Sequence, residues 1–229
     1  MTDRNAPDDT RTEVVIPLGP VRLGGTLTLP PSPRGIVLFA HGSGSSRHSP
    51  RNTFVASVLV GAGIGTLLFD LLTVGEDRDY ATRFDIGLLS QRLAGATRWL
   101  RTDAALAALP LGYFGASTGA AAALVAAAEE GGGIAAVVSR GGRPDLAGAQ
   151  ALARVSAPTL LVVGGEDDVV IELNRAAYTH LRCEKELRIV PGATHLFEEP
   201  GALEAVADLA AGWFTRWLGG RFANANGGR

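Results

Sequence analysis

Short, continuous apolar runs alternate with longer segments of helical character along most of this chain. Apolar runs of this kind, bounded by turn residues, are typical of strands that are buried on both faces. Strands that alternate with helices form a mostly parallel sheet with helices on both faces. The pattern therefore predicts an α/β protein, in which ligands bind beyond the carboxyl ends of the strands.

The expected elements follow in a regular order. Two antiparallel strands, joined at Gly19-Pro20, come first, over residues 12–18 and 21–29. Buried strands are predicted at 35–40, 65–69, 111–114, 134–138, 159–163 and 186–190. Helices are predicted at 50–62, 86–101, 120–130, 145–152, 171–181 and 202–218.

The length of 229 residues suggests a single domain over residues 1–229, with flexible tails at 1–11 and 222–229. The loop at 73–83 is polar and charged and could act as a mobile lid. No insertion in the chain is large enough for a cap domain. An open, shallow site is therefore expected.

Charge and composition exclude several classes of protein. With 21 basic and 23 acidic residues and no basic cluster, we expect no nucleic-acid partner. The uncharged stretch 104–128 is long enough to cross a bilayer, but glycines and a proline interrupt it, so we interpret it as a buried strand and helix. The polar N-terminus lacks an apolar leader segment, which predicts a cytoplasmic protein. We expect either a monomer or a homodimer. Cys183, the single cysteine, is expected to be a structural thiol.

The most informative segment is Gly115-Ala116-Ser117-Thr118-Gly119, which fits the pattern G-x-S-x-G. An apolar run precedes it and an alanine-rich helix follows it, as in a sharp strand-to-helix turn that lifts a serine hydroxyl clear of the sheet. Ser117 is thus a candidate nucleophile, and its alternative role is to cap the helix.

Three other polar segments directly follow predicted strands. His41-Gly42-Ser43-Gly44-Ser45-Ser46 follows 35–40, the segment Gly164 to Val170 follows 159–163, and Pro191 to Phe197 follows 186–190. Together with Ser117 they give the order nucleophile, acid, base along one sheet edge. A serine hydroxyl needs a base such as His195, and a carboxylate must orient that imidazole. By spacing alone, either Asp167 or Asp168 can supply the carboxylate.

These four segments resemble the α/β-hydrolase superfamily, and in particular the small bacterial hydrolases that are similar to dienelactone hydrolase. The resemblance covers nearly the whole chain and implies Ser117, Asp167 and His195 as a catalytic triad. It also implies an oxyanion hole formed by the backbone N–H groups of Thr118 and Ser43. Dienelactone hydrolases carry a cysteine nucleophile, whereas this chain carries serine, so serine hydrolysis is expected instead of the dienelactone reaction.

Three further residues are candidate substrate contacts. Arg140 and Arg143 follow the predicted strand 134–138 and could hold a substrate carboxylate, since the guanidinium fork matches it. The alternative is that both pair with Asp145 or with acidic residues of the 73–83 loop. His48 lies in a polar loop near the expected site. His41 is expected to brace the oxyanion loop.

The expected activity is cleavage of a small carboxylic ester through an acyl-enzyme, with no cofactor and no metal, since no pair of histidines has metal-ligand spacing. Thioester or peptide hydrolysis, lactone or carbon–carbon hydrolysis and acyl transfer to an alcohol are the alternatives on the same triad. A binding protein that keeps this fold without catalysis is a further alternative.

Overall fold

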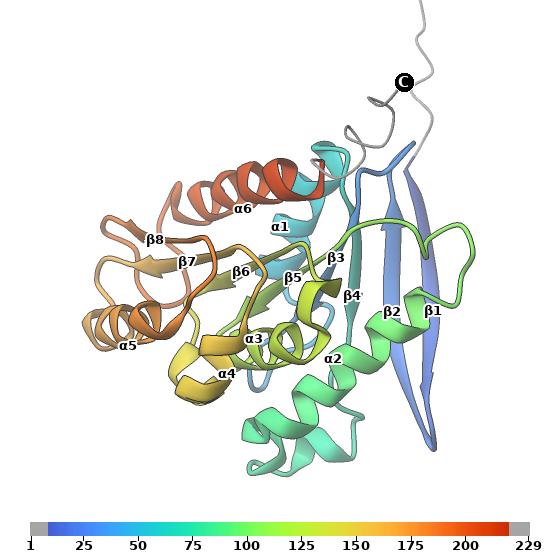
Figure 1. Ribbon diagram of the computed structural model, residues 1–229, viewed down its shortest axis with the longest axis horizontal. Helices are drawn as coiled ribbons and strands as arrows, with labels where there is room; N and C mark the ends of the chain where they lie inside the picture. The colour runs from blue at the N-terminus through green and yellow to red at the C-terminus, as the bar shows by residue number, and fades with distance from the viewer. Residues whose placement is uncertain (1–8, 220–229) are drawn as a thin grey trace, which may run out of the picture.

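The computed structural model describes residues 9–219, which form one sheet flanked by helices (Figure 1). The predicted flexible tails can be compared only in part, because residues 1–8 and 220–229 lie outside the described residues. Residues 10 and 11 are not part of a tail. They begin the first strand, where Thr10 and Arg11 pair with Leu29 and Thr28 of the second strand.

Within residues 9–219, the sheet has eight strands in the order β1-β2-β4-β3-β5-β6-β7-β8. β2 runs antiparallel to β1 and β4, and all the other neighbouring strands are parallel. The sequence predicted the antiparallel first pair and a mostly parallel sheet, but not the pairing of β2 with β4. The carboxyl ends of β3, β5, β6, β7 and β8 therefore meet at one edge. The strands are β1 (Thr10–Leu18), β2 (Val21–Leu29), β3 (Ile36–Ala40), β4 (Gly65–Phe69), β5 (Leu111–Ala116), β6 (Ala136–Arg140), β7 (Thr159–Gly164) and β8 (Lys185–Val190).

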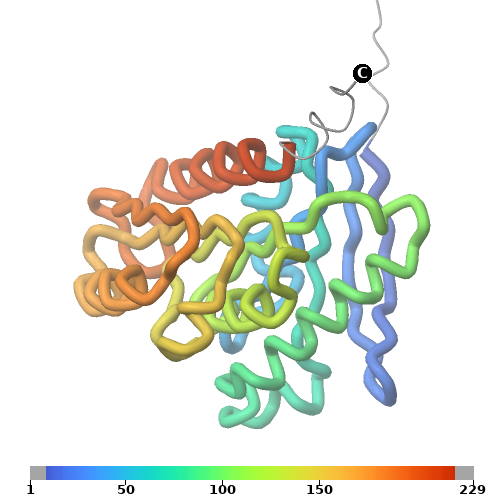
Figure 2. The backbone as a smooth tube through the Cα atoms, viewed as in Figure 1, coloured from blue at the N-terminus to red at the C-terminus, as the bar shows by residue number. Residues whose placement is uncertain are grey.

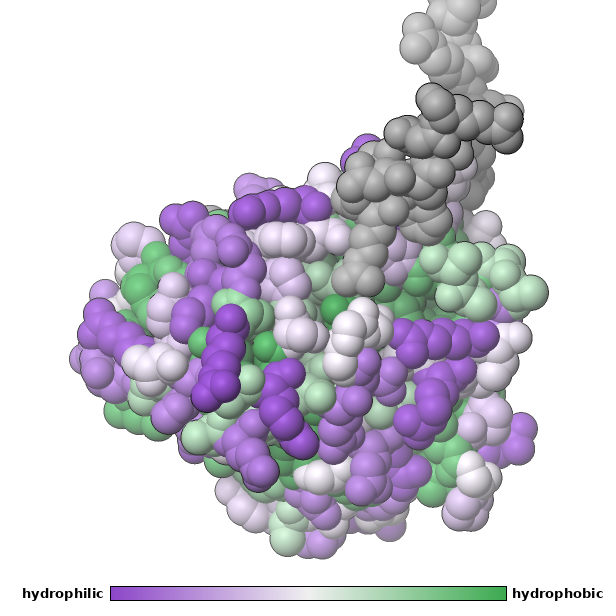
Figure 3. All heavy atoms as spheres, viewed as in Figure 1, coloured by the Kyte–Doolittle hydropathy of each residue, from purple (hydrophilic) through white to green (hydrophobic). Residues whose placement is uncertain are grey.

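Helices cover both faces of the sheet. α1 and α6 pack on one face, and α2 to α5 pack on the other (Figure 1). Hydrophilic residues cover much of the α2–α5 side, with smaller hydrophobic areas between them (Figure 3). The helices are α1 (Pro50–Gly61), α2 (Ile86–Leu100), α3 (Thr118–Glu130), α4 (Gly148–Arg154), α5 (Asp168–His180) and α6 (Ala202–Leu218).

Local sequence explains where two of these helices begin. The Ser49 hydroxyl accepts a hydrogen bond from the N–H of Asn52 at the start of α1, and Pro50 occupies the first helical position. The Asp85 carboxylate accepts from the N–H of Leu88 at the start of α2. Side-chain acceptors at this position satisfy amides that have no partner within the helix.

The uncharged stretch noted in the sequence becomes β5 and α3, and this prediction is confirmed. β5 lies in the middle of the sheet with every residue buried, and α3 is buried along most of its length. None of the helices within residues 9–219 is long and apolar enough to span a bilayer.

Several predicted boundaries differ from the structure by two or three residues, and two of these differences affect the loop after β6. The strand expected at 134–138 is β6, which runs from Ala136 to Arg140, because its pairing with β5 starts at Gly112 and Ala136. Arg140 is therefore the last residue of a strand and not part of the following loop. The helix expected at 145–152 is a 3₁₀ turn over Pro144–Ala147 followed by α4.

Both edges of the sheet are charged. β1, one edge strand, carries Arg11, Glu13 and Pro17. β8, the other edge strand, carries Lys185 and the ion pair between Arg188 and Glu186. The hairpin of β1 and β2 extends along one end of the molecule, beside α2 (Figure 2).

Candidate active site

Ser117 lies at a strained turn between β5 and α3. Its backbone has φ 50° and ψ −121°, a conformation that costs free energy for a residue with a side chain. Two backbone bonds fix the turn, since the Ser117 N–H donates to the Arg140 carbonyl (3.2 Å) and the Arg143 N–H donates to the Ser117 carbonyl (3.1 Å). Strain that the surroundings hold in place marks this serine as a candidate reactive group.

The glycines on either side of Ser117 are required by close packing. A methyl group added at Gly119 would overlap the carbonyl oxygen of Ala40, and one added at Gly115 would overlap the backbone of Ala120. The small residues of the G-x-S-x-G pattern thus let α3 approach the ends of β3 and β5.

Asp167 and His195 meet at the same sheet edge. The Asp167 Oδ2 and His195 Nδ1 atoms are 2.6 Å apart, with side chains 16% and 39% exposed. Asp167 directly follows the β7 turn, and His195 lies in the loop between β8 and α6. Gly164 makes this approach possible, because a side chain there would overlap the backbone of Ala193. Asp168 is exposed in the first turn of α5.

The loop after β3 packs against the candidate nucleophile. A Cβ atom placed on Gly42 would lie 3.1 Å from the Ser117 Cβ. The Ser43 N–H donates to the buried Thr118 hydroxyl at 2.9 Å, so in this state its hydrogen points to that hydroxyl. The Thr118 N–H is the first amide of α3 and has no acceptor one turn earlier in its own helix.

His41 braces this loop. Its Nε2 atom accepts the N–H of Leu71 at 3.0 Å, and its Nδ1 atom lies 3.0 Å from the Gly42 carbonyl. Nε2 is thus unprotonated and Nδ1 carries the hydrogen, which is the neutral imidazole. Burial lowers the pKa of His41, because the charged form would lose its hydration.

The two candidate arginines have different surroundings. Arg143 donates two hydrogen bonds to the Asp145 carboxylate, at 2.9 Å and 2.7 Å, which is the alternative role that the sequence left open. Arg140 is buried, and its Nε atom has no hydrogen-bond partner. Its guanidinium lies 5.8 Å from the centre of the Phe197 ring.

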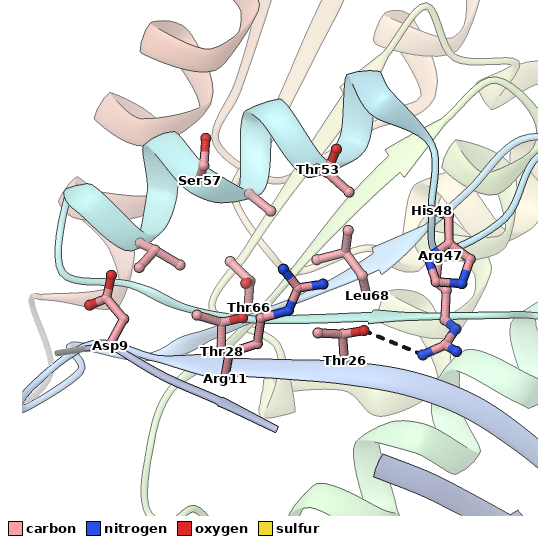
Figure 4. Close-up of a pocket in the computed structure, with 12 residues that line it drawn as sticks. Asp9, Arg11, Thr26, Thr28, Arg47, His48, Thr53, Ser57, Thr66 and Leu68 are labelled. Carbon is pink, nitrogen blue, oxygen red and sulfur yellow. Dashed lines mark hydrogen bonds between the residues drawn. The ribbon is translucent and has the colours of Figure 1, made fainter. Parts of the chain in front are cut away.

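His48 lies in a separate groove between α1 and the strands β2 and β4 (Figure 4). The groove has a volume of about 320 Å³, and Ser117, Asp167 and His195 are not among its lining residues. Arg47, beside His48, donates to the Thr26 hydroxyl and pairs with Glu13 and Asp70. His48 thus lines a groove to which these three residues do not contribute.

Ion pairs fix the loop that sequence analysis considered as a lid. Glu76 pairs with Arg92 of α2 at 2.7 Å, and Asp77 pairs with Arg83 at 3.1 Å. Within the described part of the chain, no group of three or more His, Cys, Asp or Glu side chains could hold a metal ion.

Sequence reasoning missed two residues beside the site. Arg51, near the start of α1, pairs with Glu198 in the His195 loop at 3.0 Å. Phe197, in the same loop, has a positive φ of 56° and is almost completely buried. No spacing signal could reveal the first contact, because 147 positions separate its two residues.

The order and direction of the strands, with helices on both faces of the sheet, are those of the α/β-hydrolase fold. No protein-family model matches the chain. A crystal structure of a dienelactone hydrolase from Anabaena variabilis is 57% identical, with a TM-score of 0.89, and the match covers 92% of this chain and 99% of that one. The chain belongs to the dienelactone hydrolase family.

Other comparisons add to this relationship. Est1E from Butyrivibrio proteoclasticus shares the fold with a TM-score of 0.77 at 16% identity, over 90% of this chain and 98% of that one. Two curated proteins, from two strains of Mycobacterium tuberculosis, are 62% identical over 208 residues, or 91% of this chain. They are provisionally named phosphoribosyl transferases, and the chain spans about half of their length (47%).

Proposed function

We propose that this protein is a serine hydrolase that cleaves a carboxylic ester with a short or flexible acyl group. The observation that carries the proposal is the hydrogen bond between Asp167 and His195, at 2.6 Å, on the same sheet edge as the strained turn of Ser117. Membership of a hydrolase family supports the same reaction. Asp167, His195 and Ser117 then act as one unit.

In the first half of the reaction, the Ser117 oxygen attacks the ester carbonyl while His195 Nε2 takes the hydroxyl proton. Asp167 holds Nδ1–H and stabilises the imidazolium that forms. When the tetrahedral intermediate collapses, the bond to the alcohol breaks and His195 gives its proton to the leaving oxygen. Water repeats these steps on the acyl-enzyme and releases the acid together with free Ser117.

The negative oxygen of the intermediate needs two donors. The Thr118 N–H is one, and we assign the Ser43 N–H as the other. The Ser43 N–H now donates to the Thr118 hydroxyl, so it must exchange that acceptor for the substrate oxygen. Binding of the transition state, and not of the substrate alone, would then drive this exchange.

The triad permits other acyl chemistry, including thioester and lactone hydrolysis and acyl transfer. The transferase name of the mycobacterial proteins concerns chains about twice as long as the matched region, and no observation on the described residues favours that reaction here. Partition of the acyl-enzyme between water and added alcohols would separate hydrolysis from acyl transfer.

The first test is hydrolysis of p-nitrophenyl esters of graded acyl length, beside labelling with a fluorophosphonate. The wild type is expected to take the label and to prefer short acyl chains. Ser117→Ala should lose the label and roughly a thousandfold or more of kcat, because the nucleophile is gone.

Ser57→Ala is the matched control, since Ser57 lies on α1, where its hydroxyl donates to the Phe54 carbonyl. It should keep both the label and the activity. If the wild type takes no label and cleaves no ester, the protein is not a serine hydrolase. The alternative, a binding protein that keeps this fold without catalysis, would then replace the proposal.

A further inference from the structure

The hydroxyl of Thr118 lies beside the proposed oxyanion hole. Thr118 is 2% exposed, and its Oγ1 atom accepts the Ser43 N–H at 2.9 Å. The Thr118 N–H is the first amide of α3 and has no acceptor one turn earlier in that helix. In the free protein, a buried side-chain oxygen therefore occupies the same N–H that we assign to the negative oxygen of the intermediate.

The hydrogen of this hydroxyl is not used by another part of the structure. A hydroxyl group carries one donor and two acceptor positions, and its hydrogen can rotate about the C–O bond. Within residues 9–219, the Thr118 hydroxyl accepts one hydrogen bond and donates none. A buried donor without an acceptor costs free energy, so this hydrogen is available to an acceptor that enters the site.

Close packing holds the loop after β3 in place. An added Cβ at Gly42 would lie 3.1 Å from the Ser117 Cβ, so the loop cannot move closer to the candidate nucleophile. His41 Nε2 accepts the Leu71 N–H at 3.0 Å, which fixes the start of the same loop. When a substrate oxygen arrives, the group that can adjust with the least movement is the Thr118 hydroxyl.

The position of this hydroxyl brings it next to the developing charge. Two oxygens that accept the same N–H at hydrogen-bond distance must lie close to one another. The negative oxygen that binds the Ser43 N–H therefore lies beside Thr118 Oγ1. The lone pairs of the two oxygens would repel each other, whereas a hydroxyl hydrogen turned toward the negative oxygen would attract it.

We propose that the Thr118 hydroxyl is a third donor of the oxyanion hole. This inference rests on the proposed ester hydrolysis. As the ester oxygen becomes negative, the Ser43 N–H passes to it from the Thr118 hydroxyl, which then turns its own hydrogen to the same oxygen. The hydroxyl keeps its proton throughout. Because a charged oxygen accepts more strongly than a neutral carbonyl, this bond favours the transition state over the bound substrate.

The kinetic test uses p-nitrophenyl acetate and two variants of Thr118. Thr118→Val removes the hydroxyl and keeps the shape of the side chain. Its kcat and kcat/KM should fall together by roughly 10²- to 10³-fold, the loss typical of one oxyanion donor. Thr118→Ser keeps a hydroxyl and should recover most of this loss. If Thr118→Val does not fold by circular dichroism, Thr118→Ala makes the same comparison with Thr118→Ser.

Thr66→Val is the matched control. Thr66 is also a buried threonine, 1% exposed, but it lies on β4 and lines the groove that contains His48 (Figure 4). The control makes the same chemical change away from Ser117 and should leave kcat unchanged.

A substrate with sulfur in place of the carbonyl oxygen separates charge stabilisation from packing. Sulfur is a weak hydrogen-bond acceptor, so the thiono analogue of p-nitrophenyl acetate gains little from an oxyanion donor. The loss in Thr118→Val should therefore be much smaller for the thiono ester than for the oxygen ester. Equal losses on the two esters would overturn the proposal, because Thr118 would then act only through its packing around Ser117.

Two other results would also overturn the proposal. A higher kcat in Thr118→Val would mean that the hydroxyl competes with the substrate for the Ser43 N–H. An unchanged kcat in Thr118→Val, beside an active wild type, would refute the third donor and leave the proposed function standing. A wild type that cleaves no ester would instead refute the proposed function, and this inference with it.

Discussion

Asp167 and Asp168 are adjacent in sequence but have different surroundings. Asp167 lies just before α5 and contacts His195 Nδ1 at 2.6 Å, whereas Asp168 is exposed in the first turn of the helix. The spacing of the sequence could not choose between them, since both follow β7 directly. One residue of difference along the chain turns the side chain from the site to solvent.

This contrast gives a prediction with a built-in control. Asp167→Asn should lower kcat by roughly 10⁴-fold, because an amide no longer fixes the tautomer of His195 or stabilises its charged form. Asp168→Asn should leave kcat nearly unchanged. Ester hydrolysis at one pH, with circular dichroism to verify folding, measures both. A larger loss of kcat in Asp168→Asn than in Asp167→Asn would mean that Asp168, and not Asp167, orients His195.

Sequence reasoning could identify those candidate residues that a local pattern encodes. Ser117 follows from the glycines on either side of it, and His195 follows from its position after a strand. Arg140 was recognised as a candidate, but its lack of a partner was not predictable, since partners depend on which side chains the fold brings close. Arg51 and Glu198 escaped notice for the same reason.

At the scale of elements, the interiors of strands and helices were predictable and some of their ends were not. The strand expected at 134–138 left out Ser139 and Arg140, which are polar residues at the end of β6. The pairing of Ala116 with Arg140 extends the strand through them. A polar strand end that is buried beside Ser117 is a departure from the hydrophobic pattern, and such departures are expected at functional sites.

The connection between β3 and β4 is expected to depend on pH. His41, just after β3, accepts the N–H of Leu71, just after β4, and burial lowers the pKa of its imidazole, although Asp70 and Asp77 oppose this. Below about pH 6.5 the unfolded chain binds a proton at His41 that the folded protein excludes. The stabilisation that neutral His41 contributes is therefore complete above that pH and is lost as the pH falls through the lower pKa of the folded protein.

The free energy of unfolding of the wild type should thus decrease below pH 6.5 more steeply than that of His41→Gln, by up to about 1.4 kcal/mol per pH unit. Glutamine does not titrate, and its amide oxygen can accept the Leu71 N–H. Urea unfolding at pH 7.5, 6.5 and 5.5 measures the difference. Parallel curves for the two proteins would mean that His41 takes up its proton in the folded state.

At the scale of the whole molecule, one sheet separates two hydrophobic layers. Phe39 and Phe114, with ring centres 4.9 Å apart, belong to the α1–α6 side, and Leu93 and Tyr113 belong to the α2–α5 side. Because successive side chains of each strand enter opposite layers, the two layers are built on the same strands. This continuity is the physical basis for expecting a single domain.

The described fold should therefore unfold in one cooperative transition. Trp99 lies on α2, and Trp213 and Trp217 lie on α6, so tryptophan fluorescence reports on both layers. Fluorescence and far-ultraviolet circular dichroism should give coincident denaturation curves. Trp99→Phe leaves only the tryptophan signals of α6. Its denaturation midpoint should shift only by the small loss of stability expected from replacing one partly buried ring. Two separate midpoints would divide the sheet into independent units.

The charged edges of the sheet bear on how this chain behaves during synthesis and at high concentration. An exposed edge strand offers free amides and carbonyls to any other strand, which is the first step toward fibrous aggregates. Pro17 removes one such donor from β1, and Lys185, Glu186 and Arg188 place charge along β8. A strand of another copy that approached either edge would have to bury these charges. The edges thus protect a protein with long apolar strands from self-assembly, without any contribution from its active site.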